Sequence, residues 1–404
     1  MLENLDSVDW ARLSHAYGPA TDVPDQIRAL RSPDPETRRQ ARWELYGNIF
    51  HQGTRYEATA HAVPFLLELL AEPATPDRAD LLQLLVSIAI GYDESWLPET
   101  FPVADYRRVA EGGRAVLDAV PHPGDPGYDD DTADYEHVDA LPEEDQRRLY
   151  AHIELAAYDA VRAGVPLFRS LLDGPDPALR MAAAYALGWF PEDAAGSLPA
   201  LTGPTRADDA PVAATALVSV GLLGGEPDPA LLADPRPLVR WATAIGRARA
   251  LGAASDQATV EELLTWAAAT DGKPADLLHF DGDLAGYAGL ALRQTGPAHT
   301  GRTFEALLTR IPTVSGVEAL PVVAEALRLA FPQGRLGAGT PFTALTGPQR
   351  RLVRVLATSP ATWLLGDHTF GNFSQLVGGY GLPSSSAELL TYAGGPEPAD
   401  DRGR

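Results

Sequence analysis

Apolar and small residues recur along this chain with the period of an α-helix. In six stretches that begin at an aspartate, the residues 4, 7 and 11 positions later are mostly apolar or small. Those offsets share one face of a helix, and a small residue at offset 10 lets a neighbouring helix approach closely. The six aspartates are Asp34, Asp77, Asp176, Asp209, Asp234 and Asp281. We expect a helix after each of them.

Each aspartate is also placed to cap its helix. An aspartate at a helix start accepts hydrogen bonds from the free amides of the first turn and faces the positive end of the helix dipole. Prolines at positions 35 and 177, directly after Asp34 and Asp176, suit the first helical position. The glycine found 12 residues after several of these aspartates is expected to end the helix.

A second helix is predicted before several copies of this pattern. Residues 62–70 and 164–172 both begin with a small residue, valine and proline and continue with leucines, and residues 259–266 take the same place before Asp281. Each pair of helices forms a hairpin whose apolar faces are buried only when hairpins stack on one another.

A helix that starts at a proline, followed by the D-x3-R-x2-A-x2-A-L-G helix of residues 176–188, resembles the HEAT repeat family. The resemblance covers roughly residues 25–90 and 150–330, and residues 362–383 resemble C-terminal stretches of actinobacterial HEAT-like proteins. It implies an all-α fold, an α-α superhelix (solenoid) of HEAT-like helical hairpins. The spacing and composition of this chain add an acidic insertion and a helical C-terminal cap. The resemblance also implies that the protein binds a protein or peptide on an extended concave surface. We expect such a scaffold or adaptor to have no catalysis of its own.

The predicted organisation has five parts. HEAT-like repeats occupy residues 1–90 and 149–331, an acidic insertion residues 91–148, a helical cap residues 341–393 and a disordered tail residues 394–404. Residues 121–146 hold ten acidic residues and no basic one, so we expect a mobile loop there. It could attract a basic partner or fold over the solenoid, whereas no register matches the glycine and glutamate of an EF-hand calcium loop.

Charge and composition narrow the function. The 404 residues include 55 acidic and 32 basic residues and no cysteine, for a net charge of −23. This charge disfavours nucleic acid and anionic lipid as partners, and the lack of cysteine excludes disulfide-linked partners and thiol chemistry. Neither a signal peptide nor an apolar run long enough to span a membrane is present, so we expect a cytoplasmic protein without membrane partners.

The densest polar cluster lies in residues 48–57, with His61 just beyond. His51, Tyr56 and His61 are candidate catalytic residues of a lyase or tailoring enzyme, and Arg55 a candidate binding residue. The alternative, which we favour, is that these side chains satisfy loop carbonyls and nearby acids. Neither an H-E-x-x-H motif nor the His-Glu dipeptides of deoxyhypusine hydroxylase occur, so we expect no metal and no cofactor.

Four further residues are candidates for binding a partner. Arg42 and Trp43 belong to a basic and aromatic patch on the predicted helix after Asp34, which could also be an ordinary solvated face. Tyr185 and Trp189 could line a groove between repeats. Nucleic-acid processing, as in the HEAT-like alkylpurine DNA glycosylases, is a further alternative that the acidic charge disfavours, and a phycobilin lyase leaves no motif to recognise.

Overall fold

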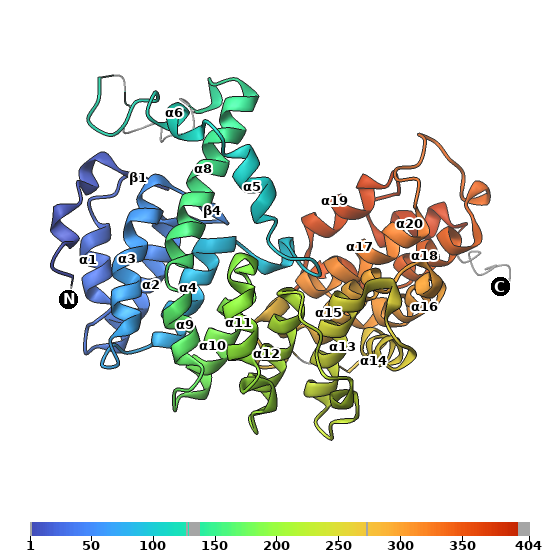
Figure 1. Ribbon diagram of the computed structural model, residues 1–404. Helices are drawn as coiled ribbons and strands as arrows, with labels where there is room; N and C mark the ends of the chain where they lie inside the picture. The colour runs from blue at the N-terminus through green and yellow to red at the C-terminus, as the bar shows by residue number, and fades with distance from the viewer. Residues whose placement is uncertain (1, 127, 129–137, 272–273, 395–404) are drawn as a thin grey trace, which may run out of the picture. The chain divides into compact units, whose positions relative to one another are not determined.

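The computed structural model describes residues 2–126, 128, 138–271 and 274–394, and it is mostly helical (Figure 1). The all-α prediction is confirmed at this level. The described chain divides into two compact units, Met1–Leu223 and Gly224–Arg404. This division falls inside the stretch 149–331 that was predicted as one array.

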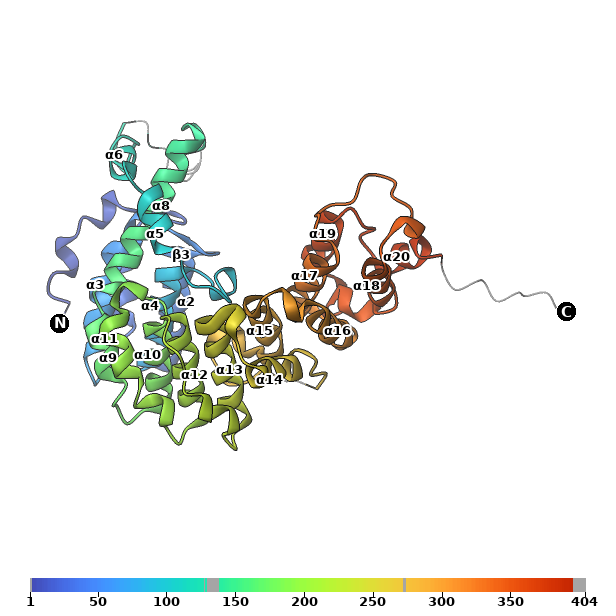
Figure 2. The same ribbon diagram turned by 45° about the vertical axis from the view of Figure 1, so that its right-hand side comes forward.

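In the N-terminal unit, helices pack on neighbours along the chain and also on helices distant in sequence. Helix α8 lies against both α3 and α4, and α10 lies between α4 and α12 (Figure 2). The helices are α1 (Val23–Ala29), α2 (Pro35–Asn48), α3 (Glu57–Ala71), α4 (Arg78–Ile90), α5 (Val103–Val109), α6 (Gly113–Leu117), α8 (Glu143–Arg162), α9 (Val165–Leu171), α10 (Pro177–Leu187), α11 (Ala194–Leu201) and α12 (Ala210–Leu222).

Three of the predicted aspartate caps are confirmed. The side chains of Asp34, Asp176 and Asp209 accept hydrogen bonds from first-turn amides of α2, α10 and α12. In each case a proline occupies one of the first two helical positions, where its missing amide hydrogen costs nothing.

The other three predicted caps are wrong. In each case the carboxylate pairs with an arginine, or another residue occupies the cap position. Asp77 precedes α4 in a left-handed conformation and pairs with Arg38 instead of the helix amides. Asp234 binds the side chain of Arg236, which is itself the residue before α13. Asp281 is also left-handed, and Asp283, two residues later, caps α15.

The start of α3 also differs from the prediction. The helix begins at Glu57, so Pro64 lies inside it and not at its start. Thr59 explains the earlier start: its hydroxyl oxygen accepts the amide of Tyr56 at 2.8 Å and its hydroxyl donates to the carbonyl of Ile49 at 2.6 Å. In α9, by contrast, Pro166 stands in the first turn as predicted.

The predicted insertion is partly helical. Helices α5 and α6 and the first turns of α8 lie within residues 91–148, and α8 continues without a break across the predicted boundary at 148/149. Phe101, before α5, stacks on Tyr158 of α8 at 5.1 Å between ring centroids. Of the predicted mobile loop, residues 127 and 129–137 lie outside the described residues.

The C-terminal unit continues with helices up to residue 392. Helix α17 packs on α15, α16, α18 and α19. The helices are α13 (Pro237–Leu251), α14 (Gln257–Ala267), α15 (Leu284–Ala291), α16 (Thr300–Arg310), α17 (Ala319–Ala330), α18 (Gly347–Ala357), α19 (Gly371–Gly379) and α20 (Ser386–Tyr392).

One apolar core joins the predicted cap to the helices before it. This core runs from Phe304 in α16 to Leu389 in α20. The connection between α17 and α18 packs onto the same helices, because the amide of Leu336 donates to the carbonyl of Tyr380 and the hydroxyl of Tyr392 donates to that of Thr340. Of the predicted disordered tail, residues 395–404 lie outside the described residues.

Three two-residue hairpins, which the sequence analysis did not predict, stand before α1, α3 and α19. They pair β1 (Ser14–His15) with β2 (Gly18–Pro19), β3 (Phe50–His51) with β4 (Thr54–Arg55), and β5 (Leu364–Leu365) with β6 (His368–Thr369). In the second hairpin the turn residues Gln52 and Gly53 both have positive φ, which suits the right-handed twist of the paired strands. The Gln-Gly pair between two strand-forming stretches was the available signal.

Candidate binding site

Exposed aromatic side chains gather in the N-terminal unit. Tyr17, Trp43, Tyr46 and Tyr92 are all exposed, and Trp43 is 69% exposed. An exposed tryptophan leaves a large apolar surface in water, and tryptophan and tyrosine are the residues most often found at the centre of protein interfaces. This surface is therefore the first candidate for binding a partner.

The position of Trp43 follows from the burial pattern of α2. Ala41 and Leu45 are buried and face the helices behind α2. Trp43 is two residues from each of them, which places it on the opposite side of a helix with 3.6 residues per turn. Tyr46 lies one turn further along, next to Trp43 on the helix surface.

A hollow of about 460 Å³ lies between α2 and α4 beside Trp43. Arg42 crosses it, with Nη2 2.9 Å from Oδ2 of Asp80 on α4. The predicted binding residues Arg42 and Trp43 thus lie together at one site. Its lining residues are Arg39, Arg42, Trp43, Tyr46, Asp80, Gln83, Leu84 and Ser87.

A buried phenylalanine packs behind two of the exposed tyrosines. The ring of Phe50 is 4.8 Å from that of Tyr46 and 5.6 Å from that of Tyr92, in edge-to-face arrangements. Gly53 leaves room for this packing, because a Cβ atom there would lie 3.2 Å from the Tyr92 ring. The two exposed tyrosines are therefore held on one fully buried side chain.

His51 has a structural role in this region. Its Nδ1 lies 3.1 Å from the carbonyl oxygen of Gly47 and 3.2 Å from the hydroxyl of Tyr17. A carbonyl oxygen can only accept, so Nδ1 carries the hydrogen in its bond to Gly47. The Tyr17 contact joins the hairpin β1–β2 to the hairpin β3–β4.

The other two predicted catalytic residues lie in different environments. Tyr56 is buried at the start of α3, whereas His61 is exposed on the surface of the same helix. The hydrogen bonds of the His51 ring run to Gly47 and Tyr17. The structure therefore does not bring the three predicted side chains together around one exposed point.

Arg55 is not a surface binding residue as predicted. It is only 4% exposed, and its Nη2 lies 3.2 Å from Oε2 of Glu154 on α8. Burial lowers the pKa of Arg55 and the nearby Glu154 carboxylate opposes this. Burial, and then Glu154, raise the pKa of the neighbouring Tyr106 to about 12. Arg55 thus connects the hairpin β3–β4 to α8.

The prediction that Tyr185 and Trp189 line a groove is also wrong, because both side chains are buried. The hydroxyl of Tyr185 donates to Oδ2 of Asp93 at 3.1 Å, and the carbonyl of Trp189 accepts from the hydroxyl of Tyr158 at 3.3 Å. Segments distant in sequence cover these two rings. The sequence pattern around residues 185–189 could not indicate this burial.

A second hollow in the N-terminal unit, of about 540 Å³, is occupied by charges that satisfy one another. Arg107 of α5 pairs with Asp159 at 2.7 Å and with Glu192 at 2.8 Å, and Arg162 of α8 pairs with Asp193 at 2.6 Å. Because each of these three acids is paired with one of the two arginines, we interpret this hollow as a joint between α5, α8 and the segment before α11.

The sequence analysis missed the contribution of α4 to the hollow beside Trp43. Tyr46 had a signal, since it lies one turn from Trp43, but Asp80 and Gln83 come from another helix. Among the described residues, no group of three or more histidine, aspartate or glutamate side chains is arranged to hold a metal ion. In the same part of the chain, no helix has both the length and the apolar character needed to cross a bilayer.

Comparisons with known proteins add little. No family model matches this chain, and no curated protein matches it. Among solved structures, a crystal structure of an engineered protein is similar over 93% of this chain and 92% of its own, at 18% sequence identity and a TM-score of 0.30. A likeness this distant carries no argument about fold or function.

Proposed function

We propose that this protein is a HEAT-like helical-repeat scaffold, without catalysis of its own, that binds a basic segment of a partner protein at the hollow between α2 and α4. The observation that carries the proposal is the exposure of Trp43 beside a hollow in which Arg42 is already held by Asp80. The repeated hairpin pattern and its resemblance to HEAT proteins support the repeat assignment.

The ion pairs of α2 and α4 favour binding by a preformed surface. Arg42 is held by Asp80, and Arg38 is held by Asp77 at 2.7 Å. Side chains that are fixed before binding lose less conformational entropy when a partner arrives. Trp43 can then contribute its apolar face, and Gln83 and Ser87 their hydrogen-bonding groups, to the bound segment.

The charge of the N-terminal unit as a whole favours a basic occupant, because the two arginines that line the hollow are already paired with acids, Arg39 with Glu36 and Arg42 with Asp80. Residues 1–223 contain 37 acidic and 17 basic residues, whereas residues 224–404 contain 18 and 15. The N-terminal unit therefore holds nearly all the negative charge and attracts cationic segments over long range. An arginine or lysine of the partner can also stack on the ring of Trp43 in a cation–π contact.

The proposal can be tested with two peptides and two variants. The probes are a short peptide of alternating arginine and leucine and its counterpart with glutamate in place of arginine. Calorimetric titration should show binding of the basic peptide alone. Trp43→Ala should weaken it about tenfold or more, because a central tryptophan is lost.

Leu365→Ala is the matched control, since Leu365 is an exposed apolar residue of the C-terminal unit. It should leave the affinity unchanged. Equal binding of the acidic and basic peptides would contradict the charge argument. Equal affinity of the wild type and Trp43→Ala for the basic peptide would show that the peptide does not bind at α2.

A further inference from the structure

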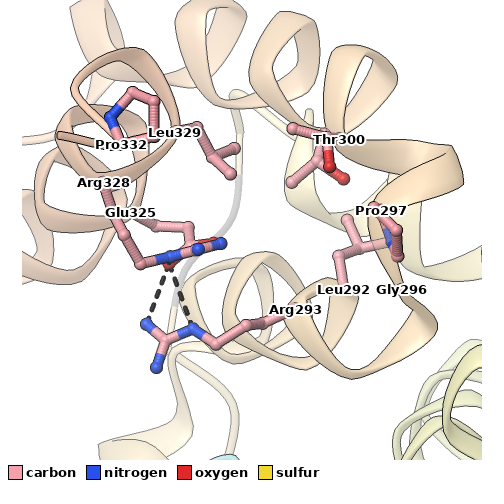
Figure 3. Close-up of a pocket in the computed structure, with 10 residues that line it drawn as sticks. Leu292, Arg293, Gly296, Pro297, Thr300, Glu325, Arg328, Leu329 and Pro332 are labelled. Carbon is pink, nitrogen blue, oxygen red and sulfur yellow. Dashed lines mark hydrogen bonds and ion pairs between the residues drawn. The ribbon is translucent and has the colours of Figure 1, made fainter.

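A pocket of about 380 Å³ lies within the C-terminal unit (Figure 3). Its walls come from the segment after α15, from α16 and from α17. Its volume lies within the range of small-molecule sites. The lining residues are Leu292, Arg293, Gly296, Pro297, Thr300, Thr303, Glu325, Arg328, Leu329 and Pro332.

A buried carboxylate organises the polar side of this pocket. Glu325 is 1% exposed and holds two arginines. Arg293 donates from Nη2 to Oε2 at 2.8 Å, and Arg328 donates from Nε to Oε2 at 2.8 Å and from Nη2 to Oε1 at 2.5 Å. Figure 3 shows both arginine side chains converging on Glu325. The two guanidinium groups are therefore fixed before any ligand arrives.

The charge of this side of the pocket is positive. Two arginines face one glutamate, which leaves one net positive charge in a protein of net charge −23. Within the part of the chain that the structure describes, the Nη1 groups of Arg293 and Arg328 have no hydrogen-bond acceptor. These groups remain available to an anion.

The remaining walls are mainly apolar. Leu292, Pro297, Leu329 and Pro332 line them, and the Thr300 hydroxyl adds a polar group. Thr303 already donates its hydroxyl to the carbonyl of His299 at 3.1 Å. A ligand that fits this arrangement has one anionic end and an apolar body.

We propose that this pocket binds a small organic carboxylate, with its carboxylate on Arg293 and Arg328 and its apolar body against Leu292 and Leu329. One net positive charge balances one carboxylate, whereas a phosphate monoester carries nearly two negative charges at neutral pH. The two Nη1 groups, one from each arginine, also match the two oxygens of a carboxylate. The site is separate from the hollow beside Trp43 and does not depend on the function proposed for it.

The test uses benzoate, benzamide and phenyl phosphate as probes of the full-length chain. Benzoate and benzamide share their size and shape, but only benzoate carries a charge. Calorimetric titration should show benzoate binding and no detectable benzamide binding. Arg293→Gln and Arg328→Gln should each weaken benzoate binding at least about tenfold, because each removes a charged donor.

Two further variants separate loss of the site from loss of folding. Arg302→Gln removes an arginine of α16 that pairs with Glu261 outside the pocket, so benzoate affinity should not change. Leu329→Trp should block the pocket and abolish binding while keeping both arginines. Circular dichroism melting should show that all variants remain folded.

Three results would overturn the proposal: equal binding of benzamide and benzoate, unchanged affinity in both arginine variants, or no benzoate binding at millimolar concentration. Binding of phenyl phosphate about tenfold tighter than benzoate would overturn the choice of a carboxylate.

Discussion

Nη2 of Arg55, in the hairpin β3–β4, lies 3.2 Å from Oε2 of Glu154 in the middle of α8. The hairpin precedes the predicted insertion (residues 91–148) and Glu154 follows it. This ion pair therefore joins the two segments between which the insertion lies. The Arg55 side chain is almost fully buried, and Gly91 makes room for it, because a Cβ at that position would lie 3.0 Å from Nη1.

Removing the acidic partner of this pair should destabilise the N-terminal unit strongly. Glu154→Gln leaves the Arg55 guanidinium buried without a counter-charge, and we expect a loss of about 3 kcal/mol of unfolding free energy. Urea denaturation followed by circular dichroism measures the change. Replacing both residues by methionine should recover most of the loss.

Asp105→Asn is the control for this prediction. Asp105 pairs with Arg108 on the surface of α5, where both side chains are about 70% exposed, so its loss should cost at most about 0.5 kcal/mol. If Glu154→Gln costs no more than this control, the buried pair does not stabilise the fold.

The stability of the C-terminal unit should fall in mild acid because of His279. This side chain is buried, and burial lowers its pKa from 6.5 to about 3. In this pH range the histidine is protonated in the unfolded chain but not in the folded chain. The free energy of unfolding therefore decreases as the pH falls from about 6.5 to about 3. From this residue alone we expect a loss of about 2 kcal/mol between about pH 7 and pH 5.

Urea denaturation of the wild type and of His279→Phe at these two pH values measures this effect. The variant should show a shallower dependence of stability on pH, whatever its absolute stability. His61→Gln, which removes an exposed histidine, should keep the wild-type dependence. An unchanged dependence in His279→Phe would show that this residue is not the acid-sensitive group.

The contact between α10 and α12 should not tolerate a side chain at Gly188. A Cβ at this position would lie 2.8 Å from Oγ and 3.0 Å from Cβ of Ser219. We expect Gly188→Ala to cost about 1–3 kcal/mol of unfolding free energy through overpacking. Thermal melting of Gly203→Ala should show almost no change, because no atom beyond the adjacent residues lies within 4 Å of where its Cβ would be.

Gly188 also shows how a correct pattern can have a different physical cause. We expected this glycine to end its helix, but its φ is −61°, which any residue adopts. The glycine is needed because Ser219 of α12 lies directly against it. The repeated sequence pattern predicted a glycine at the end of this helix. Only the packing of α12 explains why a larger residue does not fit there.

The parts of the fold that could be predicted depend on neighbours within one turn of helix. The caps at Asp34, Asp176 and Asp209 are examples, because the proline and the first-turn amides lie beside the aspartate. The exposure of Trp43 follows in the same way from the positions of Ala41 and Leu45.

The parts that could not be predicted depend on distant segments. Tyr185 is covered through its bond to Asp93, and Arg55 is buried by α8, so neither could be recognised as interior from its own surroundings. The pocket at Glu325 requires Arg293 and Arg328 to meet across two helical segments. The sequence around each of these residues does not indicate that they lie close together in the fold.

The apolar core that runs from Phe304 to Leu389 has a consequence for the order of folding during synthesis. Helices α16 and α17 leave the ribosome long before α20, which completes their core. The N-terminal unit closes within residues 1–223 and can fold while the rest is still being made. Until α18 and α19 emerge, the part of α17 that packs on them stays uncovered, so this is the interval in which a nascent chain most needs a chaperone.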